Sequence, residues 1–324
     1  FFFKQKTAYE IKECDWSSDV CSSDLANRGG TQRPLGVLGR SGNWPRVVMM
    51  VLEWFEQGLS LQQGSRAFMT LLGISLSIQT LEYLVVARRD QVMRWDLQLH
   101  ETPERPSWLR PLLRWLFQSG NYTTLLVLRL LLAVLLLAGW HGVWLSVPLM
   151  GIAVLLLFRW RGAFNGGSDF MTLVALSALL LSDVLRPWWG TESAWRAAMW
   201  WVSLQLVTSY FMSGWVKLKN AGWRQGLTLP VFLDTGIYGP LPEGSLFRRP
   251  MLAAGLSWAF ILWEGLFVLV YLDVRLAWVA CAIGTVFHFL VYWYFGLNRF
   301  FWAWLTTYPA LLCTVTEWTM SHRF

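Results

Sequence analysis

Long apolar segments separated by short polar or charged segments make up most of the chain after residue 66. A run of about 20 apolar residues is long enough to cross the hydrocarbon core of a bilayer as a helix. By this criterion the sequence predicts about eight spans, at 67–87, 122–140, 143–158, 169–187, 194–217, 251–272, 276–295 and 300–318. The predicted fold class is therefore all-α, a polytopic helical bundle in a membrane that occupies residues 66–324.

The residues before the first span have a different composition. Residues 26–65 form a lead-in that is rich in Gly, Arg and Pro at its start. Its apolar stretch at 47–55 is too short to span a bilayer and predicts an interfacial helix. Residues 1–25 hold three lysines, five acidic residues and two of the four cysteines. This segment resembles the translation of a sequencing-library adapter, and its acidic residues do not fit a signal peptide. We therefore expect residues 1–25 to be a non-native addition.

Composition favours a membrane protein over soluble classes. Apolar residues make up 55% of the chain, tryptophan occurs 23 times, and the mean hydropathy is +0.40. The formal net charge is +7, but the arginines lie between apolar blocks, as loop charges of multi-pass membrane proteins do. They form no single basic patch, so nucleic acid is not an expected partner. Cys281 and Cys313 lie in separate apolar segments, and we expect core residues there rather than a metal site.

Ionisable residues inside the predicted spans are the first candidates for function, because charges in hydrocarbon are costly. Arg129, Asp183, Glu264 and His288 have this position. For Arg129 we expect a buried ion pair with Asp183 or Glu264. Glu264 lies between strongly apolar neighbours in the middle of its span.

His288 belongs to a polar stripe along one predicted helix. Cys281, Thr285, His288 and Tyr292 follow one another at spacings of four, three and four residues and share a helix face. A polar face in a membrane helix predicts contact with a cavity or with another helix.

Two lysines close one apolar span, and they are the only lysines after residue 25. Every other cation in that region is an arginine, which keeps its proton in proteins, whereas a lysine in apolar surroundings can become a neutral amine. Tyr210, Ser213 (or Gly214) and Lys217 share a face, and Gly214 leaves room for a helix or a flat ligand to approach the backbone. A desolvated Lys217 would be a general base. An adjacent acid such as Glu264 would instead keep the Lys217 amine charged. A purely structural interpretation is that two lysines at a helix end complement the helix dipole.

These residues resemble a known family in their order along the chain. Tyr210-Phe211-x-x-Gly214-x-x-Lys217-Leu218, followed by Trp223 and Gly226, is similar to a motif of the vitamin K-dependent γ-glutamyl carboxylase and of the horizontally transferred transmembrane (HTTM) domain proteins. The turn from Asn165 to Asp169, the spacing from Glu264 to His288, and Tyr308-Pro309 agree in the same order. The resemblance covers roughly residues 60–324.

The resemblance implies a specific chemistry. Lys217 would be the base that deprotonates vitamin K hydroquinone, with His288 as a neighbouring polar group and Glu264 as its partner or a structural acid. Reaction with oxygen would generate a stronger base that removes a γ-proton of glutamate before carbon dioxide adds. The substrate or a reduced quinone cofactor would be bound in an apolar pocket whose residues include Tyr210, Gly214, Trp223 and Tyr292.

The sequence also departs from the family, and this shapes the expected substrate. Val216 stands where the carboxylase has the first of two paired lysines, and no large extramembrane domain follows the last span. We therefore expect a small or lipid-soluble substrate rather than a peptide.

Two functional hypotheses follow for what we predict to be an HTTM-type protein of the bacterial plasma membrane. The first is an enzyme with carboxylase-like or quinol-linked proton abstraction. The alternative is a non-enzymatic protein that binds lipid or quinone or assembles as a subunit of a membrane complex. A transporter is disfavoured because the sequence has no internal repeat and no pair of broken helices. The expected partners are the bilayer and a hydrophobic or quinone ligand, and the sequence does not identify a protein partner.

Overall fold

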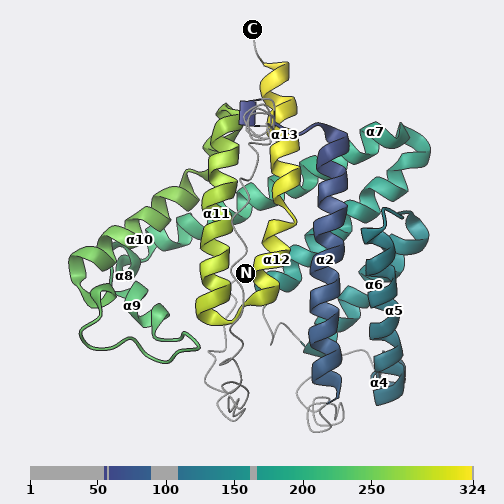
Figure 1. Ribbon diagram of the computed structural model, residues 1–324, viewed down its shortest axis with the longest axis horizontal. Coiled ribbons are helices and arrows are strands. Elements are labelled where there is room, and N and C mark those ends of the chain that lie inside the picture. Colours follow the sequence, from purple (N-terminus) through teal and green to yellow (C-terminus); the bar gives the residue numbers. More distant parts are fainter. Residues whose placement is uncertain (1–54, 57, 89–108, 161–165, 323–324) are drawn as a thin grey trace, which may run out of the picture. The chain divides into compact units, whose positions relative to one another are not determined.

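Helices are the regular structure of the chain wherever the computed structural model describes it, at residues 55–56, 58–88, 109–160 and 166–322 (Figure 1). These residues belong to one unit, Leu52–Phe324. The adapter-like segment at 1–25 and the apolar stretch at 47–54 lie outside the described residues. So does the start of the turn that was predicted at Asn165.

In the described part of the N-terminal half, four helices precede α7. Helix α2 begins earlier than the predicted span because Ser60 and Gln63 form a capping box. The Gln63 backbone N–H donates to Ser60 Oγ at 3.3 Å, and the Ser60 N–H donates to Gln63 Oε1 at 3.0 Å. A short amphipathic helix, α4, precedes α5. The helices are α2 (Leu61–Ala87), α4 (Leu109–Leu116), α5 (Ser119–Leu137) and α6 (Val143–Trp160).

Helix α7 (Gly166–Lys219) consists of two helical segments that meet at a kink and correspond to two predicted spans, 169–187 and 194–217. The spans are separated only at Gly190, whose φ of 77° and ψ of 164° interrupt the helical backbone. A residue with a side chain rarely adopts this conformation, so glycine allows the chain to change direction within one turn. The predicted loop between these spans is therefore a kink.

The C-terminal half is more broken than predicted. The span at 251–272 changes from α-helix to 3-10 helix after Gly265, and the span at 300–318 is divided where Pro309 opens a new helix. The elements are α8 (Ala221–Arg224), α9 (Thr228–Leu233), η3 (Leu246–Arg248), α10 (Pro250–Gly265), η4 (Phe267–Leu272), α11 (Val274–Phe295), α12 (Asn298–Leu305) and α13 (Tyr308–Ser321).

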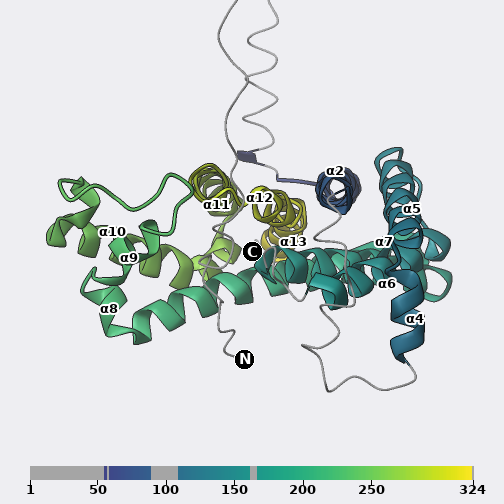
Figure 2. The same cartoon turned by 90° about the horizontal axis from the view of Figure 1, so that it is seen from below.

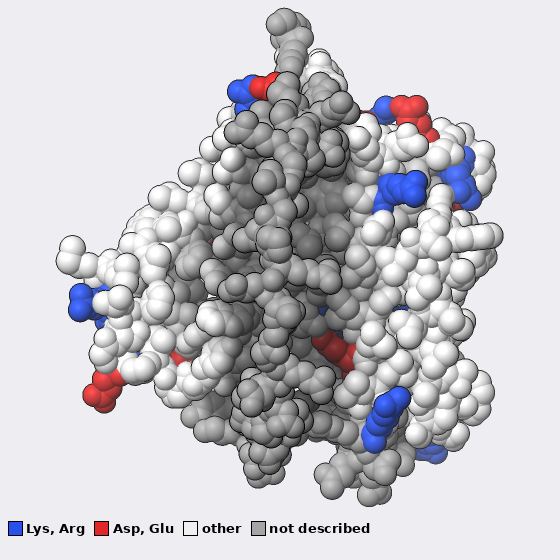
Figure 3. Space-filling model, viewed as in Figure 1, with Lys and Arg blue, Asp and Glu red and all other residues white. Residues whose placement is uncertain are grey.

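Five helices are long and apolar enough to cross a membrane: α2, α5, α6, the part of α7 at Gly167–Lys219, and α11. On the face shown in Figure 3, uncharged side chains cover most of the described surface. The predicted all-α fold is confirmed for the described residues, and the five long apolar helices agree with a multi-pass membrane protein. The predicted number of about eight spans is not confirmed by these five helices.

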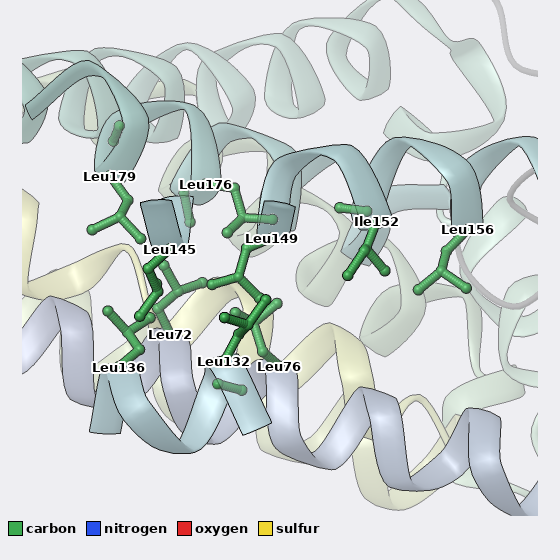
Figure 4. Close-up of a cluster of buried hydrophobic side chains, with 14 of the residues drawn as sticks. Leu72, Leu76, Leu132, Leu136, Leu145, Leu149, Ile152, Leu156, Leu176 and Leu179 are labelled. Atoms are coloured by element: carbon green, nitrogen blue, oxygen red, sulfur yellow. The ribbon is translucent and has the colours of Figure 1, made fainter. Parts of the chain in front are cut away.

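The buried apolar side chains form two clusters, and α7 contributes to both. One cluster joins α2, α5 and α6 to α7 residues on both sides of its kink, and leucines from these four helices point toward one another (Figure 4). The other joins α7 to η4, α11, α12 and α13. In Figure 2, α2, α11 and α13 are seen nearly end-on, and α7 crosses beside them. Helix α7 thus supplies side chains to both halves.

Candidate functional site

Lys217 and Glu264 form an ion pair between α7 and α10. The amine Nζ donates to Glu264 Oε2 at 2.5 Å and to Ser213 Oγ, one helical turn earlier, at 2.6 Å. The two charged side chains are 18% and 4% exposed. Of the two alternatives that the sequence left open, the structure has the one in which Glu264 lies directly beside the amine.

Gly214 is the reason that Glu264 reaches Lys217. A Cβ atom at this position would lie 2.8 Å from the Cα of Gly265 and 3.0 Å from the carbonyl carbon of Glu264. These separations are too short for a real side chain, so only glycine lets α10 pack this closely against α7. The neighbour that the sequence anticipated at Gly214 is therefore a helix.

Trp223 completes the surroundings of the amine. Asn220 caps the short helix α8 by accepting hydrogen bonds from the backbone N–H groups of Gly222 and Trp223 at 2.8 and 3.3 Å. Lys217 Nζ then lies 5.5 Å from the centre of the Trp223 ring, within the range of a cation–π interaction. Lys219, in contrast, is exposed and lies over Trp215. The two lysines therefore have different environments.

Tyr210 is the centre of a buried hydrogen-bond chain. Its hydroxyl lies 2.7 Å from His288 Nε2 and 2.9 Å from the hydroxyl of Tyr308 on α13. All three side chains are at least 96% buried. Gly284 of α11 makes room for the chain, since a Cβ atom there would lie 3.1 Å from the Tyr210 hydroxyl and would overlap that of Tyr308.

Aromatic rings enclose Tyr210. The ring centres of Trp263 and Trp304 both lie 5.0 Å from that of Tyr210. Three buried nitrogen atoms in this shell, Nε1 of both tryptophans and Nδ1 of His288, have no hydrogen-bond partner among the described residues. Buried polar atoms are normally paired. These three nitrogens around Tyr210 are therefore hydrogen-bonding groups that the described residues do not satisfy.

The remaining predicted residues lie elsewhere. The polar stripe on α11 is buried at Cys281 and His288, but Tyr292 at its end is 38% exposed and stacks on Phe301. The structure therefore does not bring Tyr292 to the Tyr210 centre.

The ion pair predicted for Arg129 is wrong. Arg129 donates to Thr80 Oγ1 at 2.9 Å and to Gln79 Oε1 at 3.0 Å, and both partners are neutral residues of α2. Asp183 pairs instead with His141, 2.9 Å away. Uncharged acceptors satisfy a buried guanidinium equally well in geometry, and pairing by opposite charge does not identify them.

Tyr308, Trp263 and Trp304 belong to this region but were not assigned to the site from the sequence. For Tyr308 a signal was present. This tyrosine was noted only as part of the Tyr308-Pro309 end of the resemblance, although a tyrosine between apolar residues is itself a signal of a buried hydroxyl. Among the residues described here, no group of three or more His, Cys, Asp or Glu side chains is placed to hold a metal ion.

Comparisons with known proteins give no relative. No family model matches the sequence, no characterised protein is similar to it, and no solved structure matches the fold. The family resemblance therefore remains a prediction, and the case for a function depends on the geometry of α7, α10 and α11.

Proposed function

We propose that the Lys217–Glu264 pair is the acid–base centre of a membrane enzyme that removes a proton from a lipid-soluble hydroxyl compound. The observation that supports this most is the 2.5 Å ion pair between apolar helices, with exposures of only 18% and 4%. Removing two charges from water costs several kcal/mol per ion. Ionisable residues at such positions in membrane proteins usually serve a function.

The proposed mechanism starts from the ionic pair, in which Lys217 carries the proton and cannot accept another. Transfer of this proton from Nζ to Glu264 Oε2 produces a neutral amine and a neutral carboxylic acid, and burial penalises this state less than the ionic one. The neutral amine then accepts the proton of a substrate hydroxyl and becomes an ammonium beside the new oxyanion. Ser213 Oγ, which accepts a hydrogen bond from Nζ at 2.6 Å, holds the amine in position through these steps.

A reduced quinone fits the chemistry of the neighbouring side chains. The unpaired indole N–H groups of Trp263 and Trp304 are donors for its oxygens, and the rings around Tyr210 offer faces for stacking. When bound, such a compound supplies an acidic hydroxyl and reducing electrons. Tyr210, His288, Gly214 and Trp223 would then belong to the substrate region, as the resemblance to HTTM proteins and the vitamin K-dependent carboxylase implies.

The wider proposal is an HTTM-type protein with eight spans in a bacterial plasma membrane. This number is reached when α7 is counted as two spans and α10–η4 and α12–α13 as one span each. Helices α2, α5, α6 and α11 supply the remaining four.

The test is turnover of a reduced naphthoquinone by the protein in liposomes, measured as its aerobic consumption. We expect Lys217→Ala and Glu264→Gln to lower the rate by at least about 100-fold, as the loss of a general base does. Lys219→Ala is the matched control and should keep the wild-type rate. Equal rates for the Lys217 and Lys219 variants, or no turnover by the wild-type protein, would contradict the proposal.

The second candidate is a non-enzymatic quinone-binding protein. The unpaired nitrogens of Trp263, Trp304 and His288 favour it, because binding needs these donors but does not need the ion pair. In this case wild-type protein would bind the quinone without consuming it, and Lys217→Ala would bind it as tightly as wild type.

A further inference from the structure

A second buried polar cluster lies in the other half of the unit, at Arg129 of α5. This side chain is only 1% exposed. Its two terminal nitrogens donate to Thr80 and Gln79 of α2, which leaves Nε buried without a hydrogen-bond partner. A guanidinium N–H that is buried and unpaired is expensive, so its surroundings require an explanation.

Asp169, near the start of α7, has an unpaired hydrogen-bond acceptor. Its side chain is 12% exposed, and its Oδ1 lies 3.8 Å from Arg299 Nη1. Its other oxygen, Oδ2, is buried and has no partner. Arg129 and Asp169 thus present one unpaired donor and one unpaired acceptor, and no ion pair joins them directly.

Both residues line the same small cavity. The cavity measures about 10 Å³, and Gln79, Tyr83, Ala153 and Thr172 also contribute to its wall. One water molecule needs roughly 10–15 Å³ and two or more polar partners. The cavity therefore has the size and the polar groups for a single water-sized guest.

The charges on the wall restrict what this guest is. A cation would face the guanidinium of Arg129, and an anion would face the carboxylate of Asp169. A neutral molecule that both donates and accepts hydrogen bonds satisfies both groups at once. We propose that this cavity is a binding site for one structural water molecule, which accepts a hydrogen bond from Arg129 Nε–H and donates one to Asp169 Oδ2.

The water would complete a polar connection between the two halves of the unit. Glu82 of α2 accepts from Arg299 Nε of α12 at 2.7 Å, and Arg299 lies beside Asp169 of α7. The water extends this connection from Asp169 to Arg129 of α5. Helices α2, α5, α7 and α12 are thereby joined through one polar network, which is separate from the Lys217 pair.

Two substitutions of one wall residue test the proposal. Ala153 of α6 is 8% exposed and lines the cavity. Valine at this position would displace the water and leave Arg129 Nε and Asp169 Oδ2 unpaired, whereas serine adds a hydroxyl that can join the network. We expect Ala153→Val to lower the thermal unfolding midpoint in detergent clearly more than Ala153→Ser does.

The opposite order would overturn the proposal, because a dry cavity accepts methyl groups and penalises a buried hydroxyl. Cryo-electron microscopy at a resolution that reveals ordered water gives an independent readout. Density for one water between Arg129 and Asp169 is the expected result, and an empty cavity would refute it. A wild-type midpoint that shifts when NaCl is replaced by KCl or NaBr at equal ionic strength would identify an ion instead.

Discussion

The Lys217–Glu264 pair makes a stability prediction that does not require a known substrate. Breaking a buried ion pair by removing one partner costs about 3–5 kcal/mol, because the other charge is left uncompensated. Lys217→Met would leave Glu264, which is 4% exposed, without its cation. Glu264→Gln would leave Lys217 18% exposed and still bonded to Ser213. We therefore expect the lysine variant to be the less stable of the two.

The double variant, Lys217→Met with Glu264→Gln, removes both charges and should recover much of the loss. The two effects should then fail to add by about 2–3 kcal/mol, the upper range for residues in contact. Reversible unfolding in mixed micelles, followed by circular dichroism, measures the four free energies of unfolding. Lys219→Met is the matched control and should change stability by less than about 0.5 kcal/mol, as exposed substitutions do. Single-variant effects that add within about 0.5 kcal/mol would refute a direct pair.

Three further predictions concern the packing around this site. Gly214→Ala should cost about 1–3 kcal/mol by forcing α10 away from α7, whereas Gly255→Ala, where an added Cβ meets no atom within 4 Å, should be neutral or slightly stabilising in the same unfolding assay. Tyr210→Phe should cost about 1–3 kcal/mol, because His288 and Tyr308 both lose a buried partner. Tyr292→Phe should leave the free energy of unfolding unchanged. An equal effect of Tyr210→Phe and Tyr292→Phe in thermal unfolding would contradict the hydrogen-bond chain. Gly284→Ala should lower the midpoint like Tyr210→Phe, since its methyl group would overlap the Tyr308 hydroxyl.

The positions of the long apolar helices followed from the length of the apolar runs, but the ends and breaks of these helices did not. The start of α2 depends on the reciprocal hydrogen bonds of Ser60 and Gln63, which precede the apolar run. The kink at Gly190 depends on one backbone conformation, whereas the sequence around it looked like a loop. The change to 3-10 helix after Gly265 has no clear signal in an apolar sequence. Local capping and backbone geometry decide these features, and hydropathy does not report them.

The candidate site was predictable where its members share one helix. Tyr210, Ser213 and Lys217 were grouped by helical spacing alone, and the structure places Ser213 Oγ 2.6 Å from the amine. The pairing of Lys217 with Glu264 joins residues 47 apart, so it depends on how α10 packs against α7. Gly214 was the signal for that packing, but a glycine does not say which helix approaches it.

Pairing buried residues by opposite charge predicted their contacts less well than helical spacing did. It failed for Arg129, whose partners are the neutral side chains of Gln79 and Thr80. The number of suitable neutral acceptors along a helix is large, so the sequence alone could not select among them. The three-dimensional contact between α2 and α5 makes the selection.

The most direct test of the proposed acid–base centre follows the proton that leaves Lys217. Infrared difference spectra, recorded on adding a reduced naphthoquinone, report the protonation of individual carboxylates. We expect a new band of a protonated carboxylic acid that is absent in Glu264→Gln and unchanged in Lys219→Met. If no such band appears while the compound binds, or if the band persists in Glu264→Gln, proton transfer within the pair is contradicted.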